Sequence, residues 1–208
     1  MKSTYVKAIV AVAMTMMAGA ASAQLGGLTK ALNIGGSSGG SVTAEQIVAK
    51  YVGGTQSVMR ADANMLAAVG LKDEAEKASV QAKNLTEGAT KGSLEEAAAV
   101  RTANSEALER SLNGKKIEMD AASKKQFANG VGDLARGVIQ YVDMSKDVGS
   151  FKPGMSSIGA AAGSALFVAK NLPDSIKNLG RSLKTAVDFS KANNIPVPKE
   201  ATDATSLL

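Results

Sequence analysis

The chain has 208 residues, a formal net charge of +5, and neither histidine nor cysteine. Without these two residue types, Ser-His and Cys-His catalytic pairs, histidine-ligated haem, zinc sites of nitrogen or sulfur ligands, and disulfide bonds are excluded. The excess of basic residues is too small to indicate a nucleic-acid partner. Aromatic residues make up only 3% of the chain, so a core must be built mainly from Ala, Leu, Val, Ile and Met.

The first 23 residues have the pattern of a signal peptide. Lys2 and Lys7 precede an uncharged apolar run at 8–21, and the run Ala-Ser-Ala at 21–23 offers the small-x-small site that signal peptidase reads. The apolar run is shorter than the roughly 20 residues that span a bilayer comfortably. We therefore expect cleavage before Gln24 and a mature protein that is periplasmic or secreted.

Residues 24–42 are rich in glycine and serine, which predicts a flexible linker. A phosphate-binding loop is the alternative, but no Gly-Lys-Ser/Thr follows. The pattern Thr43-x-x-Gln46 then predicts a capping box at the start of the first helix, and Gly70 predicts its end. We expect a single helical domain over residues 43–192.

Further helices are predicted along the rest of this domain. A charged helix is expected over 72–87, and Ser93-x-x-Glu96 predicts the start of another that ends at Asn113. The clearest pattern is a later a/d seam, whose members step alternately by four and three residues. The members of this seam are Phe127, Val131, Leu134, Val138, Tyr141, Ser145 and Val148.

Prolines divide the C-terminal part of the chain. Residues 155–169 carry no charge, and Pro173 is expected to end that segment before a last helix over 174–192. Pro196 and Pro198 predict an extended tail at 193–208. The patterns together predict an all-α fold. The expected architecture is an up-and-down bundle of four to six helices with coiled-coil-like seams, a flexible N-terminal linker and an extended C-terminal tail.

Carboxylates are the groups left for acid–base chemistry. The densest groups are at 73–76, at 95–96, and at Asp143 with Asp147. Paired carboxylates hydrolyse sugars only when they face each other across a groove, whereas charge runs on helices are typical of solvated faces. We therefore expect no enzyme activity, no metal and no cofactor, with a carboxylate-dependent hydrolase as the minor alternative.

Tyr51, Val58 and Met65 recur every seven residues on the first predicted helix. Such a face packs on another helix. It is therefore a candidate surface for a protein partner, and the alternative is that it forms the protein's own core.

Two other features suggest contact with a membrane or a second copy. Gly159 and Gly163 are four residues apart, which permits close helix crossing. Lys177, Arg181 and Lys184 form a basic stripe on the last predicted helix, as in helices that lie on anionic membranes. The alternatives are a buried helix of a soluble bundle and an ordinary solvated face.

The sequence thus favours an exported, non-enzymatic helical protein. We expect a periplasmic interaction protein, such as an adaptor or a chaperone-like assembly factor, with an unidentified protein partner or a second copy of itself. The alternative is a membrane-active or membrane-associated protein that uses residues 155–169 and the basic face of the last helix.

Overall fold

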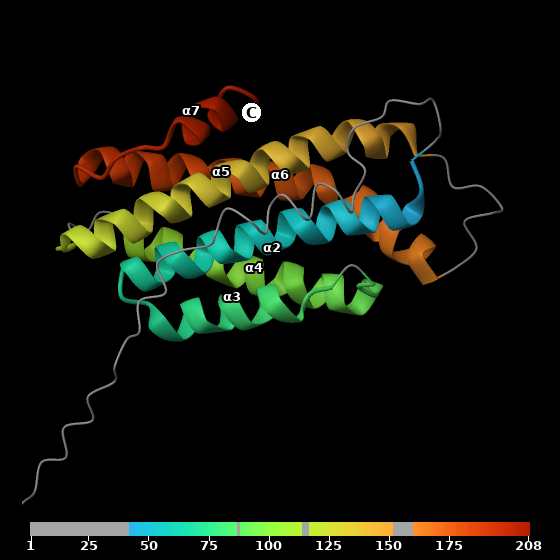
Figure 1. Cartoon of the computed structure of the whole chain (residues 1–208), viewed down its shortest axis with the longest axis horizontal. Coiled ribbons are helices and arrows are strands. Elements are labelled where there is room, and N and C mark those ends of the chain that lie inside the picture. Colours follow the sequence, from blue (N-terminus) through green and yellow to red (C-terminus); the bar gives the residue numbers. More distant parts are fainter. Residues whose placement is uncertain (1–41, 87, 114–116, 152–159) are drawn as a thin grey trace, which may run out of the picture. The chain divides into compact units, whose positions relative to one another are not determined.

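A computed structural model describes residues 42–86, 88–113, 117–151 and 160–208. Residues 1–41, which carry the predicted signal peptide and nearly all of the predicted linker, lie outside these ranges. Within them the chain forms helices and no strand, so the all-α prediction is confirmed for this part (Figure 1). The helices are α2 (Ala44–Ala68), α3 (Lys72–Asn84), α4 (Lys91–Leu112), α5 (Ala121–Ser150), α6 (Ala160–Ala192) and α7 (Lys199–Thr205).

The ends of α2 follow the local sequence. The Thr43 side chain accepts a hydrogen bond from the Gln46 backbone N–H, and the Gln46 side chain accepts one from the Thr43 N–H. This reciprocal pairing satisfies two donors that a helix start leaves free. The helix ends at Ala68, before Gly70, whose φ of +88° glycine adopts without strain. Both predicted ends are confirmed.

Two other boundaries differ from the prediction. α4 begins at Lys91 rather than after Ser93, because the Thr90 side chain accepts a hydrogen bond from the Ser93 N–H and caps the helix. Pro173 lies inside α6 instead of ending a segment. Its ring is exposed, and its cost of about 3 kcal/mol is offset by the burial of Leu172 and Leu179, at about 1.5–3 kcal/mol each.

The prediction of an extended tail is wrong for residues Lys199–Thr205, which form α7. Residues 195–198, between α6 and α7, are not helical, and Pro198 has an extended backbone. Pro198 is the residue before the first turn, where a missing N–H costs nothing, so it precedes the helix rather than breaking it. Ala201 and Ala204 are fully buried, and this burial holds the short helix on the rest of the fold.

α2 and α5 approach each other most closely through glycine. A methyl group added at Gly137 would lie 2.6 Å from Cγ2 of Val58, and one added at Gly130 would lie 2.6 Å from Cγ of Met65. Because the contacts run in opposite directions along the two helices, α2 and α5 are antiparallel. Any side chain larger than hydrogen at these two positions would force the helices apart.

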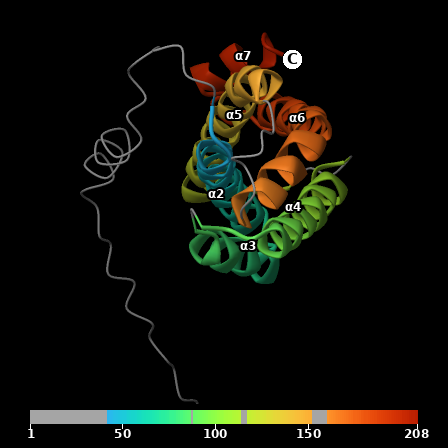
Figure 2. The ribbon, with the colours of Figure 1, turned by 90° about the vertical axis from the view of Figure 1, so that its right-hand side faces the viewer.

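The other helices pack around this pair. The Gln56 side chain of α2 donates to the carbonyl of Leu85, just after α3, at 2.6 Å. The Ser164 hydroxyl of α6 donates to the carbonyl of Ala89, just before α4, at 3.1 Å. Figure 2 looks along the helices and shows α3 and α4 on the side away from α7, with α2 and α6 between them.

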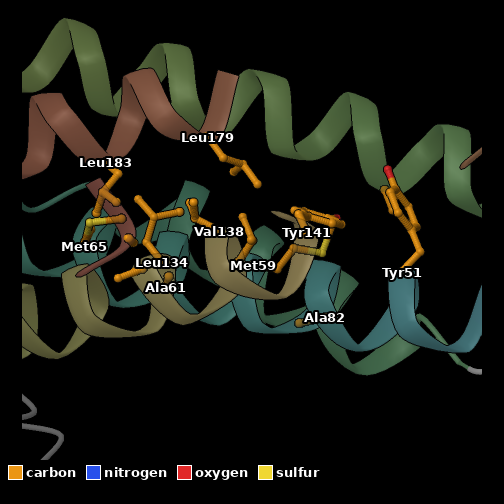
Figure 3. Close-up of a cluster of buried hydrophobic side chains, with 14 of the residues drawn as sticks. Tyr51, Met59, Ala61, Met65, Ala82, Leu134, Val138, Tyr141, Leu179 and Leu183 are labelled. Atoms are coloured by element: carbon orange, nitrogen blue, oxygen red, sulfur yellow. The ribbon is translucent and has the colours of Figure 1, made fainter. Parts of the chain in front are cut away.

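The predicted seam of α5 is buried from Phe127 to Tyr141. Ser145, its next expected member, is exposed and its hydroxyl donates to its own helix at the Val142 carbonyl, while the apolar Met144 is buried instead. Side chains from α2, α5 and α6 fill the space between these helices (Figure 3). The residues labelled there are Tyr51, Met59, Ala61, Met65, Ala82, Leu134, Val138, Tyr141, Leu179 and Leu183, of which Ala82 belongs to α3.

Candidate functional site

The partner-binding surface predicted on α2 is part of the protein's own core. Tyr51 is 1% exposed, and Val58 and Met65 are 0% exposed. The face that carries Val58 and Met65 is covered by α5 at its two glycines. The alternative stated for this face, that it forms the core, is therefore correct, and these residues are not available to a partner in this fold.

The residues predicted to contact a membrane are only partly described. Gly159 lies outside the described residues, and Gly163 is exposed with no atom within 4 Å of an added methyl group, so it supports no helix crossing in the described part. Lys177, Arg181 and Lys184 are exposed, and Lys184 pairs with Asp188 at 2.7 Å. Among the helices that the structure describes, none has the length and apolar character needed to cross a membrane.

A groove of about 790 Å³ lies between α3 and α4. Its apolar walls are Val80 of α3 and Val100, Ala103 and Ala107 of α4. The buried residues of α3 are the small side chains Ala75, Ala78 and Ala82, and its larger apolar residue, Val80, is not buried. Val80 is 48% exposed, which is unusual for a large aliphatic side chain in this structure.

Carboxylates line one rim of the groove, at Asp73, Glu74 and Glu76 of α3. The first two stand in the first turn, where negative charge favours the helix dipole. None of the three makes an ion pair with a described residue. Lys77 and Arg110 also line the groove, but Arg110 lies 3.6 Å from Glu106 of its own helix.

The polar floor of the groove is Asn104 of α4. This residue lines the groove but is only 4% exposed, and its Nδ2 atom is buried. Asp62 of α2 lies beside it, 3% exposed, and the Asn104 amide is close enough to the Asp62 carboxyl to lower its pKa as a hydrogen-bond donor.

Beyond Asn104 the polar residues continue into the core as a hydrogen-bonded cluster. Arg101 of α4 donates to the Tyr141 hydroxyl at 3.1 Å and to the Ser175 hydroxyl at 2.9 Å. The Thr55 and Tyr141 hydroxyls are 2.5 Å apart. The guanidinium also lies over the Tyr141 ring, 5.7 Å from its centre, in a cation–π geometry. Four helices, α2, α4, α5 and α6, are therefore joined by one set of buried polar contacts.

Burial raises the pKa of Asp62 to about 7, and the positive charge of Arg101 and the Asn104 amide act in the opposite direction. Burial likewise raises the pKa of the Tyr141 hydroxyl, which stays neutral at physiological pH. A titratable group whose pKa is shifted this far, next to an open groove, is typical of binding and functional sites.

The Asp62→Asn variant should be more stable than the unchanged protein above neutral pH. Native Asp62 keeps its proton up to about pH 7, whereas the unfolded chain titrates near 3.8. Between these values the native state binds more protons, so the free energy of unfolding falls as pH rises through this window and stays lower above it. The substitution takes away the titrating carboxyl, so the variant avoids this decrease in the free energy of unfolding, which amounts to a few kcal/mol at about 1.4 kcal/mol per pKa unit.

The check is urea unfolding of both proteins at about pH 5 and about pH 8. The advantage of the variant must grow toward the higher pH. An equal difference at the two pH values would contradict the raised pKa.

The carboxylate groups identified in the sequence have different surroundings. Glu95 pairs with Lys91 at 3.3 Å, and Asp147 pairs with Lys50 at 2.6 Å. The group at 73–76 lines the groove between α3 and α4. Within the described ranges, no cluster of three or more acidic residues is placed to hold a metal ion.

Comparison with known proteins gave no match, since no family model, curated protein or solved structure is significantly similar to this chain.

Proposed function

We propose that this chain is an exported, non-enzymatic interaction protein, a periplasmic adaptor or chaperone-like assembly factor, that receives its protein partner in the groove between α3 and α4. The observation that carries the proposal is this groove, which is lined by Val80, Val100 and Ala107, with the Val80 side chain 48% exposed. The pattern of residues 1–23 supports export.

We also propose that α2 to α6 form an up-and-down bundle with coiled-coil-like seams. The antiparallel approach of α2 and α5 at Gly130 and Gly137 supports this arrangement. The buried positions from Phe127 to Tyr141 on α5, which alternate in steps of four and three, support the seam. Such a scaffold would hold the two walls of the groove at a fixed separation.

A photo-crosslinking experiment tests the partner groove. A photoreactive phenylalanine analogue at position 80 is compared with the same analogue at Leu166 of α6, because the two native side chains are 48% and 47% exposed. Illumination in the producing cells should give a discrete protein adduct at position 80 and none at 166. No adduct at position 80, or the same adducts at both positions, would contradict the proposal.

Membrane association is the second candidate function. It is favoured by the exposure of Lys177 and Arg181 on α6, neither of which pairs with an acidic side chain among the described residues. Exposed cations of this kind attract anionic lipid headgroups, and salt screens the attraction. Flotation with anionic vesicles at low and high salt tests it. No association at low salt would contradict this candidate.

A further inference from the structure

We propose that Asp62 of α2 and Arg101 of α4 form a proton-controlled switch between two sets of contacts in the core. While the Asp62 carboxyl holds its proton, Arg101 donates to the Tyr141 and Ser175 hydroxyls and joins α4 to α5 and α6. When the carboxyl releases its proton to solvent, the Arg101 guanidinium turns to the carboxylate and joins α4 to α2. This switch does not depend on what occupies the α3–α4 groove.

The fold buries one acid and one base. Asp62 is 3% exposed and Arg101 is 6% exposed, whereas every other charged side chain that the structure describes is half-buried or exposed. A charge in a protein core is costly unless it is paired. Yet these two residues do not form an ion pair with each other in the described part of the chain. Arg101 donates to two neutral hydroxyls instead, so its strongest available pairing is not used.

Asn104 brings the two groups within reach of each other. It follows Arg101 by three residues on α4, and side chains at this spacing are neighbours on one helix face, with Cβ atoms about 5–6 Å apart. The Asn104 amide contacts the Asp62 carboxyl as a hydrogen-bond donor, and the positive charge of Arg101 also acts on that carboxyl. Because the arginine side chain is long and flexible, its guanidinium can reach Asp62 by rotation about its own bonds, without a shift of either helix.

The protonation state of Asp62 selects between the two arrangements. Burial raises its pKa to about 7, so both forms of the carboxyl are present near neutral pH. A neutral carboxyl offers Arg101 no charge, and the hydroxyls of Tyr141 and Ser175 remain its partners. A carboxylate accepts hydrogen bonds from a guanidinium that are about twice as strong as neutral ones. Loss of the proton therefore makes Asp62 the better partner.

The other titratable groups around the pair do not replace this control. Tyr51 of α2 and Tyr141 of α5 act on Arg101, and burial raises the pKa of the Tyr141 hydroxyl, which stays neutral. The charged residues of α3 at 73–77 line the groove beside Asn104 but are not buried, so solvent and salt screen them. α6 contributes a neutral hydroxyl to Arg101, and its described charged side chains are exposed.

Near-ultraviolet circular dichroism tests the switch, because the chain has no tryptophan and only three tyrosines. Tyr51 and Tyr141 lie in the core, and Tyr5 belongs to the predicted signal peptide (Figure 3). The tyrosine band of the purified protein is recorded from about pH 5 to about pH 9. It should change in a single step with its midpoint at a pH of about 7.

Two Asp→Asn variants assign the step to one carboxyl. Asp62→Asn keeps a neutral hydrogen-bonding side chain in the core and should abolish the step. The matched control is Asp147→Asn on α5, which removes a half-buried carboxylate that pairs with Lys50. This control should keep the step at the midpoint of the unchanged protein. Far-ultraviolet circular dichroism checks that both variants are folded.

Ser175→Ala distinguishes movement of Arg101 from titration of Asp62 alone. In the proposed switch, Ser175 bonds to Arg101 only while Asp62 is protonated, so the substitution disfavours the protonated form. The midpoint should therefore fall by about one pH unit, since a hydrogen bond to a charged group is similar in size to one pKa unit. If Arg101 kept its position, both forms would lose the bond equally and the midpoint would not move. Arg101→Gln removes the charge that lowers the pKa of Asp62, so its midpoint should rise.

A tyrosine band that stays constant between about pH 5 and about pH 9 would overturn the switch, as would a step that persists in Asp62→Asn. An unchanged midpoint in Ser175→Ala would overturn the exchange of partners by Arg101. A step that is lost in Asp62→Asn, kept in Asp147→Asn and lowered in Ser175→Ala would support it. The comparison of the two Asp→Asn variants is decisive whether or not Arg101→Gln folds.

Discussion

Tyr141→Ala should lower the free energy of unfolding by about 3–5 kcal/mol, the usual cost of removing a large buried aromatic side chain. Tyr141 is 0% exposed and packs on the Tyr51 ring, with the ring centres 5.3 Å apart. Its hydroxyl also joins Thr55 to Arg101. The substitution therefore leaves a cavity and removes a hydrogen-bond partner from both polar side chains.

Tyr141→Phe separates the two contributions. It keeps the ring and removes only the hydroxyl, so its cost should be about 1–2 kcal/mol, that of a buried hydrogen-bonding group. Urea unfolding followed by circular dichroism measures both variants. A loss for Tyr141→Ala no larger than that for Tyr141→Phe would mean that the ring packs less tightly than its burial indicates.

Gly130→Leu should cost more than about 3 kcal/mol, above the usual range for an overpacked site, or prevent folding. The first side-chain carbon would lie 2.6 Å from Cγ of Met65 and 3.0 Å from the Ala61 carbonyl oxygen. The Met65 side chain can shift, but the carbonyl belongs to the backbone of α2, so the two helices must separate along their most closely packed contact.

The matched control is Gly149→Leu on the same helix. Gly149 is exposed, and an added methyl group there meets nothing within 4 Å. Leucine also has a higher helix propensity than glycine, so this variant should gain up to about 1 kcal/mol or remain unchanged. Thermal unfolding of the two variants distinguishes the effects. A similar loss at both positions would show that the leucine side chain, rather than the helix approach, is responsible.

Part of the candidate site could be predicted from the sequence. The carboxylates at 73–76 were identified, but as a solvated face, because nothing local shows that α4 leaves a groove beside them. Arg101 and Asn104 were missed although Ala97, Arg101, Asn104 and Leu108 step by four, three and four residues. Thr55 and Asp62 likewise occupy positions between Tyr51, Val58 and Met65 in such a pattern. Polar residues at seam positions are therefore the sequence signal from which the buried cluster could have been predicted.

The sequence alone determined the features that depend on local interactions. A capping box at Thr43 and a glycine at position 70 act within a few residues of themselves, so the limits of α2 and the helical class follow without the rest of the chain. The steps of four and three along α5 likewise predict which side is buried, because the helical period places those residues on one face.

Only the tertiary structure decided what covers each face. Tyr51, Val58 and Met65 would look the same in sequence on a partner-binding surface, and they are core because Gly130 and Gly137 let α5 reach them. Pro173 stays inside α6, and α7 forms after Pro198, because contacts from distant helices bury Leu172 and Ala201. Burial against residues far along the chain outweighs local propensity in these places, and the groove between α3 and α4 is defined by the same distant packing.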